Sequence, residues 1–598
     1  MRAFGMMEYG NYRSRHAARR RQAVLTTEWA DMAELVLGPV LRHVTETSVT
    51  VWVETDAACV VDVLGRTART FSVHGHHYAL VVVDGLEPGS RQRYEVRLDD
   101  AVVWPEQESV YPPSVLRTLA PDHSQRLVFG SCRHATPSAL ETLGYEPDAL
   151  DTFAQRMATE EPSRWPDAVL LLGDQVYADH TSPKTQEFIR NRRSVDAPPF
   201  LEVADFEEYT VLYHESWSDP DIRWLLANVP SAMIFDDHDV RDDWNTSYAW
   251  RRDIESTSWW RSRIIGGLTS YWVYQHLGNL SPDDLATDSM WLAVRAAGDA
   301  GVDAGPLLER LAATSDAEVD GDQDAAGMRW SYKIDYGRTR LVVVDTRCGR
   351  VLTETERAMI SDAEFEWLAE QLDGDYDHLL VASSLPWLLP WAIHHVESWN
   401  EALCAGSRGP RLAKFGEVVR RAADLEHWSA FAESFERLGT LLGEVSRGER
   451  GPNPASISVL SGDVHHAYVA KAQFDPPGSV PVYQLVVSPV HQTVPSAIKI
   501  GFTVGWSRFA AAIARPMARW ARAPRSKVEW ERLAGPFYGN ELGTLVIDGR
   551  VARFSLERAL RTPGSAPRLS TVNQTPLSWR DHATADPVAP FPARAQIS

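Results

Sequence analysis

The sequence predicts a layered α/β domain preceded by a small all-β sandwich. The chain has 598 residues, more than one hydrophobic core usually serves, so at least two domains are expected. Its first part holds short stretches in which apolar and polar residues alternate, as in half-buried strands. Its later part holds continuous Val-, Ile- and Leu-rich runs separated by amphipathic segments, which is typical of buried strands connected by helices.

The N-terminal part is expected to form a loose arm followed by the sandwich. Residues 1–34 are polar and basic, and the sandwich is assigned to residues 35–120. Residues 48–53 and 94–98 alternate with period two, and a turn-forming segment at 85–90 lies between them. Several short strands so close together favour a β-sandwich. The spacing is similar to that of a fibronectin type III module, judged from Leu86, Pro88, Gly89, Tyr94 and Val96.

The α/β domain is assigned to residues 125–556. Its strands are predicted from apolar runs that each stop at polar residues, at positions 127–132, 168–174, 232–239, 341–347, 379–384 and 457–466. Amphipathic segments such as 364–372 and 412–425 are expected to be connecting helices.

Three further segments complete the predicted organisation. Residues 281–327 are rich in Asp, Ala and Gly and are expected to form a surface insertion. Residues 542–556 predict a hairpin that turns at Asp548 and Gly549. From 560 to 598, Pro, Ala, Ser and Thr dominate, which predicts a disordered tail.

The composition argues against several classes of protein. A net charge of −21 repels phosphate backbones, so we expect no nucleic-acid-binding surface. The four cysteines form no CxxC pair, which argues against a disulfide framework. No apolar run reaches the roughly 18 residues of a membrane span. Acidic residues soon after the arginines at 19–21 argue against an export signal. We therefore expect a cytoplasmic protein, with export left open as an alternative, and the oligomeric state is also left open.

Candidate metal ligands directly follow four of the predicted strands. Ligands bind beyond the carboxyl ends of strands in open α/β sheets, so these residues are expected to meet. Each residue alone has a simpler explanation, such as a helix cap, a solvated turn or a core histidine. Four strands that all end this way favour one shared site, made of Cys132, Arg133 and His134, then Asp174 and Tyr177, then residues 236–245, then Asp463, His465 and His466.

Electrostatics makes metal binding the strongest prediction for such a site. Asp174, Asp237 and Asp463 would share a pocket with the Cys132 thiol and the Tyr177 phenol. Like charges at close range raise carboxyl pKa values, and a multivalent cation removes that penalty. These donor types together suit ferric iron (Fe3+) beside a divalent ion such as calcium (Ca2+). Other chemistries have less support, because the sequence has no GxSxG elbow and no Walker loop in the right context.

Four short motifs occur in order along the α/β region. They are Phe129-Gly-Ser-Cys132, Gly173-Asp-Gln-Val-Tyr177, the segment from Asp236 to Asn245, and Ser461-Gly-Asp-Val-His465. Together they resemble the PhoD-like alkaline phosphatases and phosphodiesterases, which are distant members of the calcineurin-like metallophosphoesterases. The resemblance covers roughly residues 125–556. It implies an α/β/β/α layered fold with a β module in front.

The resemblance implies a role for each matching residue. Cys132 and Tyr177 would bind ferric iron, and Asp174 would bridge this iron to the second metal. Asp237 stands where the wider superfamily has a metal-binding Asn. His238 would contact the phosphate or the leaving-group oxygen.

The other motif residues complete this expected site. Asp463 and His465 would finish the metal shells, and Asp236 and Asn245 would be either ligands or partners of ligands. Asp239 is shorter than the Glu often found after the histidine in this family.

Two arginines are candidate phosphate contacts, on position and charge alone. They are Arg133 and Arg347, and for Arg347 a surface salt bridge is an equal alternative. The predicted reaction is hydrolysis of a small phosphoester by a metal-bound hydroxide, with catalytic roles for His238, Asp174 and Arg133. Monoesterase and diesterase activities stay open. The alternative function is a metal-stabilised binding protein that has lost catalysis.

Overall fold

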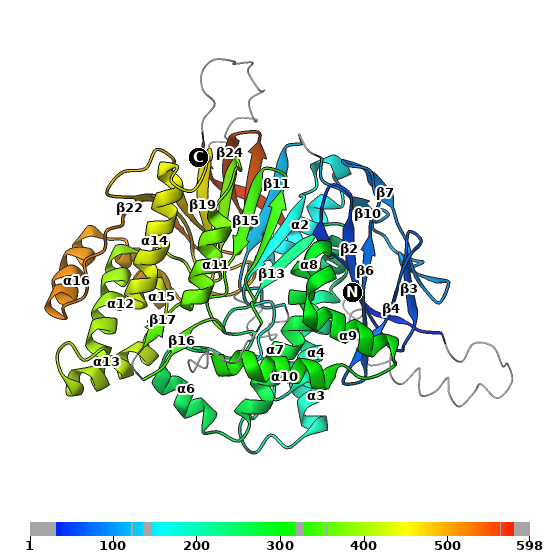
Figure 1. Ribbon diagram of the computed structural model, residues 1–598, viewed down its shortest axis with the longest axis horizontal. Coiled ribbons are helices and arrows are strands. Elements are labelled where there is room, and N and C mark those ends of the chain that lie inside the picture. The colour runs from blue at the N-terminus through cyan, green and yellow to red at the C-terminus, as the bar shows by residue number, and fades with distance from the viewer. Residues whose placement is uncertain are drawn as a thin grey trace, which may run out of the picture.

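The computed structural model describes residues 32–120, 123–135, 146–318, 328–354, 356–562 and 564–578. Figure 1 shows a β module on one side and a larger body of sheets and helices on the other. The predicted N-terminal arm lies almost wholly outside the described residues, which begin at Met32.

The N-terminal module is all-β, as predicted. One sheet has the order β1-β2-β6-β5 and a second has the order β4-β3-β8-β9, while β7 pairs with β10. The strands are β1 (Leu35–Val44), β2 (Val49–Thr55), β3 (Val60–Val63), β4 (Arg66–Arg69), β5 (Phe71–Val73), β6 (His76–Val83), β7 (Arg91–Arg93), β8 (Val96–Leu98), β9 (Ala101–Trp104) and β10 (Val115–Arg117).

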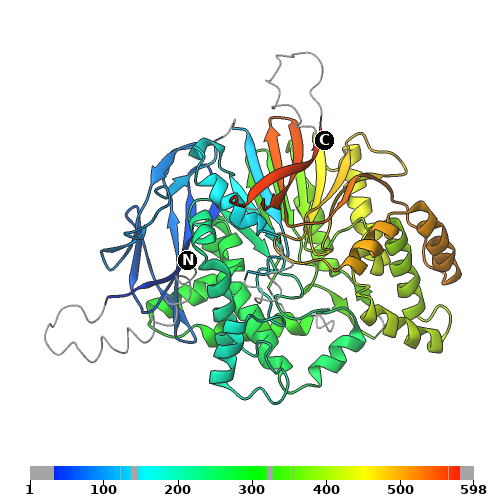
Figure 2. The same cartoon turned by 180° about the vertical axis from the view of Figure 1, so that it is seen from behind.

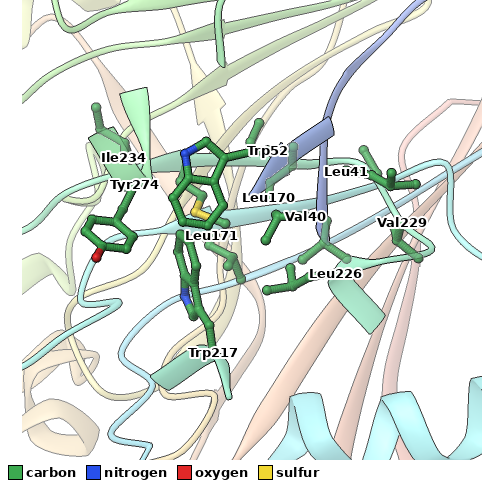
Figure 3. Packing of buried hydrophobic residues seen from close by; sticks show 14 of the residues in the cluster. Val40, Leu41, Trp52, Leu170, Leu171, Trp217, Leu226, Val229, Ile234 and Tyr274 are labelled. Atoms are coloured by element: carbon green, nitrogen blue, oxygen red, sulfur yellow. The ribbon is translucent and has the colours of Figure 1, made fainter. Parts of the chain in front are cut away.

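The β module packs tightly against the larger α/β body. Every residue of β2 is buried, so both faces of this strand are covered despite its alternating sequence. Trp52 lies edge-on to Trp217 at 6.0 Å and beside Tyr274 at 5.3 Å between ring centroids. Figure 3 shows these rings together with Leu170 and Leu171 from the α/β domain. Burying such large aromatic side chains on both partners makes a stable interface between the two parts.

The α/β body contains two sheets. The first has the order β13-β12-β11-β23-β24-β25 and the second the order β14-β15-β18-β19-β21-β20-β22. All six apolar runs identified in the sequence form strands, namely β11, β12, β13, β15, β18 and β19. The strands of both sheets, with the small pair β16 and β17, are β11 (Gln125–Gly130), β12 (Ala168–Leu172), β13 (Ser231–Ile234), β14 (Tyr332–Tyr336), β15 (Thr339–Val343), β16 (Val351–Leu352), β17 (Arg357–Ala358), β18 (His378–Ala382), β19 (Ser456–Ser461), β20 (Ala467–Gln473), β21 (Val482–Val486), β22 (Glu529–Phe537), β23 (Glu541–Asp548), β24 (Val551–Leu560) and β25 (Arg568–Pro576).

The central strands β18 and β19 of the second sheet are buried on both faces, which explains their continuous apolar runs. On β18, Leu379 and Val381 belong to a core shared with helices α11 and α14. Leu380 and Ala382, on the opposite face of the same strand, belong to the core shared with the first sheet. Successive residues of a strand point to opposite faces, so both faces must be apolar here. The result is the predicted α/β/β/α layering.

Helices cover the outer faces of the two sheets and connect their strands. Figure 1 shows α11 and α14 in front of the second sheet and α7 and α4 below the first. The helices are α2 (Ala149–Met157), α3 (Pro183–Arg192), α4 (Phe206–Trp217), α5 (Pro220–Leu226), α6 (Tyr248–Glu255), α7 (Trp260–Tyr274), α8 (Pro282–Thr287), α9 (Ser289–Asp299), α10 (Gly305–Glu318), α11 (Asp362–Leu372), α12 (Trp391–Cys404), α13 (Pro410–Ala422), α14 (Ala432–Arg447), α15 (Ser496–Gly505) and α16 (Arg508–Trp520), with short 3-10 turns at Pro162–Arg164, His276–Asn279 and Trp428–Ala430. No helix among the described residues is long and apolar enough to cross a bilayer.

The predicted insertion and the predicted tail both contain regular secondary structure. Residues 282–318 of the predicted insertion form α8, α9 and α10, and Trp291 and Leu308 are buried against the rest of the protein. The predicted hairpin is present as β23 and β24. The prediction of a disordered tail from residue 560 is wrong for Arg568–Pro576, which pairs with β24 (Figure 2). Composition does not reveal that β24 has an unpaired edge. A segment that contains Thr and Val can pair with this edge and form a strand. The tail beyond 578 lies outside the described residues.

Candidate metal centre

The predicted motifs meet because the strands that precede them are neighbours. β11, β12 and β13 are parallel, so Cys132, Asp174 and Asp237 follow the same edge of the first sheet. β19 brings Asp463 from the second sheet, and its backbone N–H donates to the Ser131 hydroxyl at 3.1 Å. Residues more than 300 positions apart in sequence are thus in contact.

Two glycines, Gly173 and Gly462, allow the loops after β12 and β19 to approach the neighbouring motifs closely. Gly173 has a φ of 105°, and a Cβ there would lie 2.6 Å from the Cβ of Asp236. A Cβ on Gly462 would overlap the hydroxyl of Ser131. A larger residue at either position would push the motifs apart.

The backbone of the site residues is unusual. Cys132, Asp174, Asn245, Asp463 and His465 all have φ between 47° and 63°. This left-handed conformation is uncommon for residues other than glycine, and it persists only where the surrounding structure holds it in place. Such strain often accompanies a functional site, and it occurs here in all four motifs.

Asp174, Asp237 and His238 form a compact cluster, with one potential ligand atom from each within 4.8 Å of the others. Burial raises the pKa of Asp174 well above its usual range; nearby carboxylates add to this rise and His238 opposes it. Asp174 Oδ1 is buried and accepts no hydrogen bond from the described residues. A multivalent cation would satisfy this oxygen and relieve the repulsion, so the carboxylates fit a metal.

The Cys132 thiol and the Tyr177 phenol lie beside this cluster. The Tyr177 hydroxyl is 3.5 Å from Asp174 Oδ2, and Cys132 Sγ is 3.8 Å from the backbone oxygen of Asp463. Burial and the charges of Asp174 and Asp463 raise the pKa of Cys132 well above its usual range. A nearby cation would reverse this effect and stabilise the thiolate. The donor set therefore fits a multivalent cation.

His238 is oriented by a neighbouring carboxylate. Its Nδ1 lies 3.0 Å and 3.1 Å from the two oxygens of Asp179, while Nε2 is 3.8 Å from the exposed carboxylate of Asp242. Burial alone would lower the pKa of His238, but Asp179 and Asp237 raise it well above its usual range. These carboxylates favour the charged imidazole, and in that form both ring nitrogens carry a proton.

Asp239 organises the two loops around Asp174. Its Oδ2 accepts the backbone N–H groups of Asp174 at 2.9 Å and Asp236 at 2.8 Å. Its Oδ1 accepts those of Gln175 and Val176, both at 3.2 Å. A carboxylate with four such donors is committed to the backbone, so the shorter Asp at this position has a positioning role.

Asp463 and His465 lie on the segment after β19, where an oxygen of Asp463 comes within 4.8 Å of oxygens of Asp236 and Asp237. His427 Nε2 bonds to Asp463 Oδ2 at 3.1 Å, and Glu397 holds His427 Nδ1 at 2.7 Å. Burial alone would raise the pKa of Asp463, but His427 and Arg347 bring it below its usual range. Burial lowers the pKa of His465 to about 4, so its imidazole is neutral and suited to metal coordination.

Arg347 is buried at the centre of the acidic residues. It has no exposed surface, and its guanidinium contacts Asp236 at 2.5 Å, Asp237 at 3.1 Å and Glu426 at 2.6 Å. The surface salt bridge considered for Arg347 is therefore wrong. Sequence position did not reveal that β15 ends inside the molecule, where buried carboxylates need a counter-charge. Arg347 contacts Oδ1 of Asp236, while Oδ2 has no hydrogen-bond partner among the described residues. Asp236, Asp237 and Asp463 each offer an oxygen within 4.8 Å of the others, so the role of Asp236 as ligand or as partner of ligands stays a prediction.

Arg133 and Asn245 are held by the protein framework. Arg133 donates from Nε to Asp148 at 2.8 Å and from Nη1 to the backbone oxygen of Ser216 at 2.9 Å. These bonds tie Arg133 to the start of α2, and its contact with phosphate stays a prediction. Asn245 donates to the backbone oxygen of Arg347 at 3.2 Å, while its side-chain oxygen has no partner among the described residues.

The two other histidines of the motifs have different surroundings. The His134 ring lies 5.0 Å from the Tyr177 ring, at the edge of the cluster. His466 is fully buried, bonds through Nδ1 to the backbone oxygen of Val464 at 2.7 Å and packs on Phe502. His466 is thus a core histidine.

Sequence comparison identifies the family. The family model described as PhoD-like phosphatase matches residues 141–531, more than half of the chain. The chain belongs to the PhoD-like phosphatase family. It is therefore a phosphatase, as the motifs predicted. A second family model, a domain of unknown function designated DUF7800, matches the β module over residues 32–116.

Structural comparison finds a solved structure with a similar fold. A solved structure titled "Structure of PhoD" matches with a TM-score of 0.54, covering 92% of this chain and 94% of that one. The two sequences are 14% identical, so this match concerns the fold alone. A search of curated proteins finds no matching sequence.

Proposed function

We propose that this PhoD-like phosphatase hydrolyses small phosphoesters with the help of cations held around Asp174. The supporting observation is the cluster of Asp174, Asp237 and His238, in which the buried Oδ1 of Asp174 has no hydrogen-bond partner among the described residues. Bound cations would neutralise phosphoryl oxygens and lower the pKa of the attacking water.

We assign the donors by their chemistry. Cys132 and Tyr177 suit ferric iron, because thiolate and phenolate are strongly donating anionic ligands. Asp174 is near the Tyr177 hydroxyl and belongs to one cluster with Asp237, which supports a role for it in holding two ions, the second being calcium or another divalent metal. Asp463 and His465 would supply further donors.

His238 supplies the proton for the leaving group in this proposal. Asp179 holds Nδ1 of His238 and keeps the ring in one orientation. Nε2 can then donate to the alkoxide oxygen that departs from phosphorus. Proton donation does not require His238 to bind the metal, although its ring belongs to the same cluster as Asp174 and Asp237.

Two substitutions test the proposal in combination with metal analysis. Asp174→Asn should lose nearly all turnover and part of the bound metal, because it removes the anionic oxygen at the centre of the cluster. His238→Ala should lower turnover by about a hundredfold or more and leave the metal content unchanged. If purified His238→Ala lost its iron, His238 would be a ligand and the assigned role would be wrong. Asp253→Asn, whose side chain is 67% exposed, is the matched control and should behave as wild type.

The choice of substrate separates the two ester classes. Turnover of p-nitrophenyl phosphate and of bis-p-nitrophenyl phosphate should be measured on the sample used for metal analysis. Ferric phenolate absorbs visible light, so the iron-loaded protein should be coloured. A colourless, fully active protein would contradict the assignment of Cys132 and Tyr177. Metal-loaded protein inactive on both esters would support the alternative of a binding protein.

A further inference from the structure

Helix α16 exposes a row of large apolar side chains. Phe509, Ile513, Met517 and Trp520 are 77%, 54%, 38% and 50% exposed. Their spacing of four, four and three residues places them on one face of the helix. Exposed apolar rows of this length are unusual on a protein surface and mark a site of interaction.

This apolar face does not hold the helix to the protein. Ala514 and Ala518 are the buried residues of α16, and the helix packs extensively on α12. Figure 1 shows α16 at the outer edge of the molecule, beyond α12 and α15. The small alanines therefore anchor α16, and the large side chains face outward for another purpose.

A row of arginines runs beside the apolar face. Arg508, Arg515 and Arg519 recur at helical spacing, and Arg522 and Arg525 follow the helix. No carboxylate among the described residues forms an ion pair with these five arginines. The sequence has no Asp or Glu between Asp475 and Glu529, although the whole chain carries a net charge of −21. A local cationic surface on such an acidic protein attracts an anionic partner.

We propose that α16 binds the surface of an anionic phospholipid bilayer. An amphipathic helix with arginines beside Phe, Ile, Met and Trp has the composition of helices that lie in the membrane interface. The apolar side chains would enter the boundary between headgroups and acyl chains, while the guanidinium groups would contact lipid phosphates. The rest of the acidic chain would be repelled by such a membrane, so α16 would set the orientation of the bound enzyme.

A neighbouring cavity is a less suitable place for the lipid. It has a volume of about 600 Å³ and is lined by Arg508, Arg515 and Arg519, but also by Glu529 and Glu531. These two carboxylates disfavour a phosphate group inside it. The outward apolar face is therefore the binding surface.

Vesicle sedimentation with the full chain tests this proposal. We expect wild type to pellet with vesicles that contain 30% phosphatidylglycerol in phosphatidylcholine, and to remain in solution with pure phosphatidylcholine. Binding should weaken at 1 M salt because screening shortens the reach of the arginine charges. The double variants Phe509→Ser/Trp520→Ser and Arg515→Gln/Arg519→Gln should each lower the partition coefficient about tenfold or more.

The control removes exposed apolar residues elsewhere. Val110→Ser/Val302→Ser changes side chains that are 91% and 57% exposed, and it should bind vesicles as wild type does. All variants should keep the wild-type thermal midpoint and turnover of p-nitrophenyl phosphate, which excludes misfolding. The proposal would be overturned if the wild-type protein did not bind anionic vesicles, or if the Val110→Ser/Val302→Ser control lost as much binding as the α16 variants. A wild-type dimer in light scattering that Phe509→Ser/Trp520→Ser makes monomeric, without vesicle binding, would assign this face to a second copy of the chain.

Discussion

The carboxylate of Asp239 offers a sharp test of how the site is assembled. Asp239→Asn keeps the size of the side chain but replaces one acceptor oxygen by an NH2 group. Each oxygen of Asp239 accepts two backbone N–H groups from the loops that carry Asp174 and Asp236. Whichever way the amide is turned, two of the four N–H groups then face a donor.

The expected loss in the free energy of unfolding follows from these two lost hydrogen bonds. A buried hydrogen bond to a charged acceptor contributes about 1.5–3 kcal/mol, so losing two should lower the free energy of unfolding by about 3–6 kcal/mol. The loops that Asp239 holds also carry Asp174, so metal affinity should fall as well. A residue that only tuned the charge of the site would affect turnover but not stability.

Urea denaturation followed by tryptophan fluorescence, with metal analysis of the same samples, measures both effects. Asp253→Asn is the control, because it removes a carboxylate that is 67% exposed and paired with Arg421. An exposed pair of this kind contributes no more than about 1 kcal/mol. If Asp239→Asn had the wild-type urea midpoint, Asp239 would not organise these loops and the reasoning would be refuted.

Three further results are expected. Arg347→Leu should lower the free energy of unfolding by about 3–5 kcal/mol in urea, because it leaves buried carboxylates without a counter-charge; a wild-type midpoint would contradict this. Burial alone would lower the pKa of His76, but hydrogen bonds to Glu207 and Glu54 raise it to about 9. This folded-state pKa exceeds the unfolded value near 6.5. His76 therefore contributes stability below about pH 6.5 that is lost as pH rises through 9, about 1–2 kcal/mol after allowance for solvent. His76→Ala should flatten that part of the stability profile, and an unchanged profile would count against it. Chelation of the metal-loaded enzyme should lower its thermal midpoint, and adding metal should restore it. A ligand present at a hundredfold its Kd stabilises the native state by about 2.7 kcal/mol. An unchanged midpoint would show that the cations do not stabilise the fold.

Much of the fold could be predicted from the sequence because burial on both faces leaves a strong pattern. The run at 379–384 is apolar on both faces since helices cover one side of β18 and the first sheet covers the other. Order that depends on a distant partner leaves no such pattern. Arg568–Pro576 looks polar and becomes a strand only because β24 is available to pair with it.

Some residues of the candidate site could be predicted from the sequence and others could not, for the same reason. Cys132, Asp174 and Asp463 could be singled out because each directly follows a strand, and the structure brings them together. His427 and Glu397 could not, since they lie in or near helices and reach the site only through tertiary packing. The burial of Arg347 was missed for a related reason, because nothing local indicates that its neighbours are carboxylates.

The most direct test of the central claim is the position of bound metal. Anomalous diffraction from crystals of the iron-loaded protein, recorded at the iron absorption edge, should give a peak within coordination distance of Asp174, Cys132 and Tyr177. A strong peak elsewhere, or none at this place in protein that hydrolyses phosphoesters, would contradict the account.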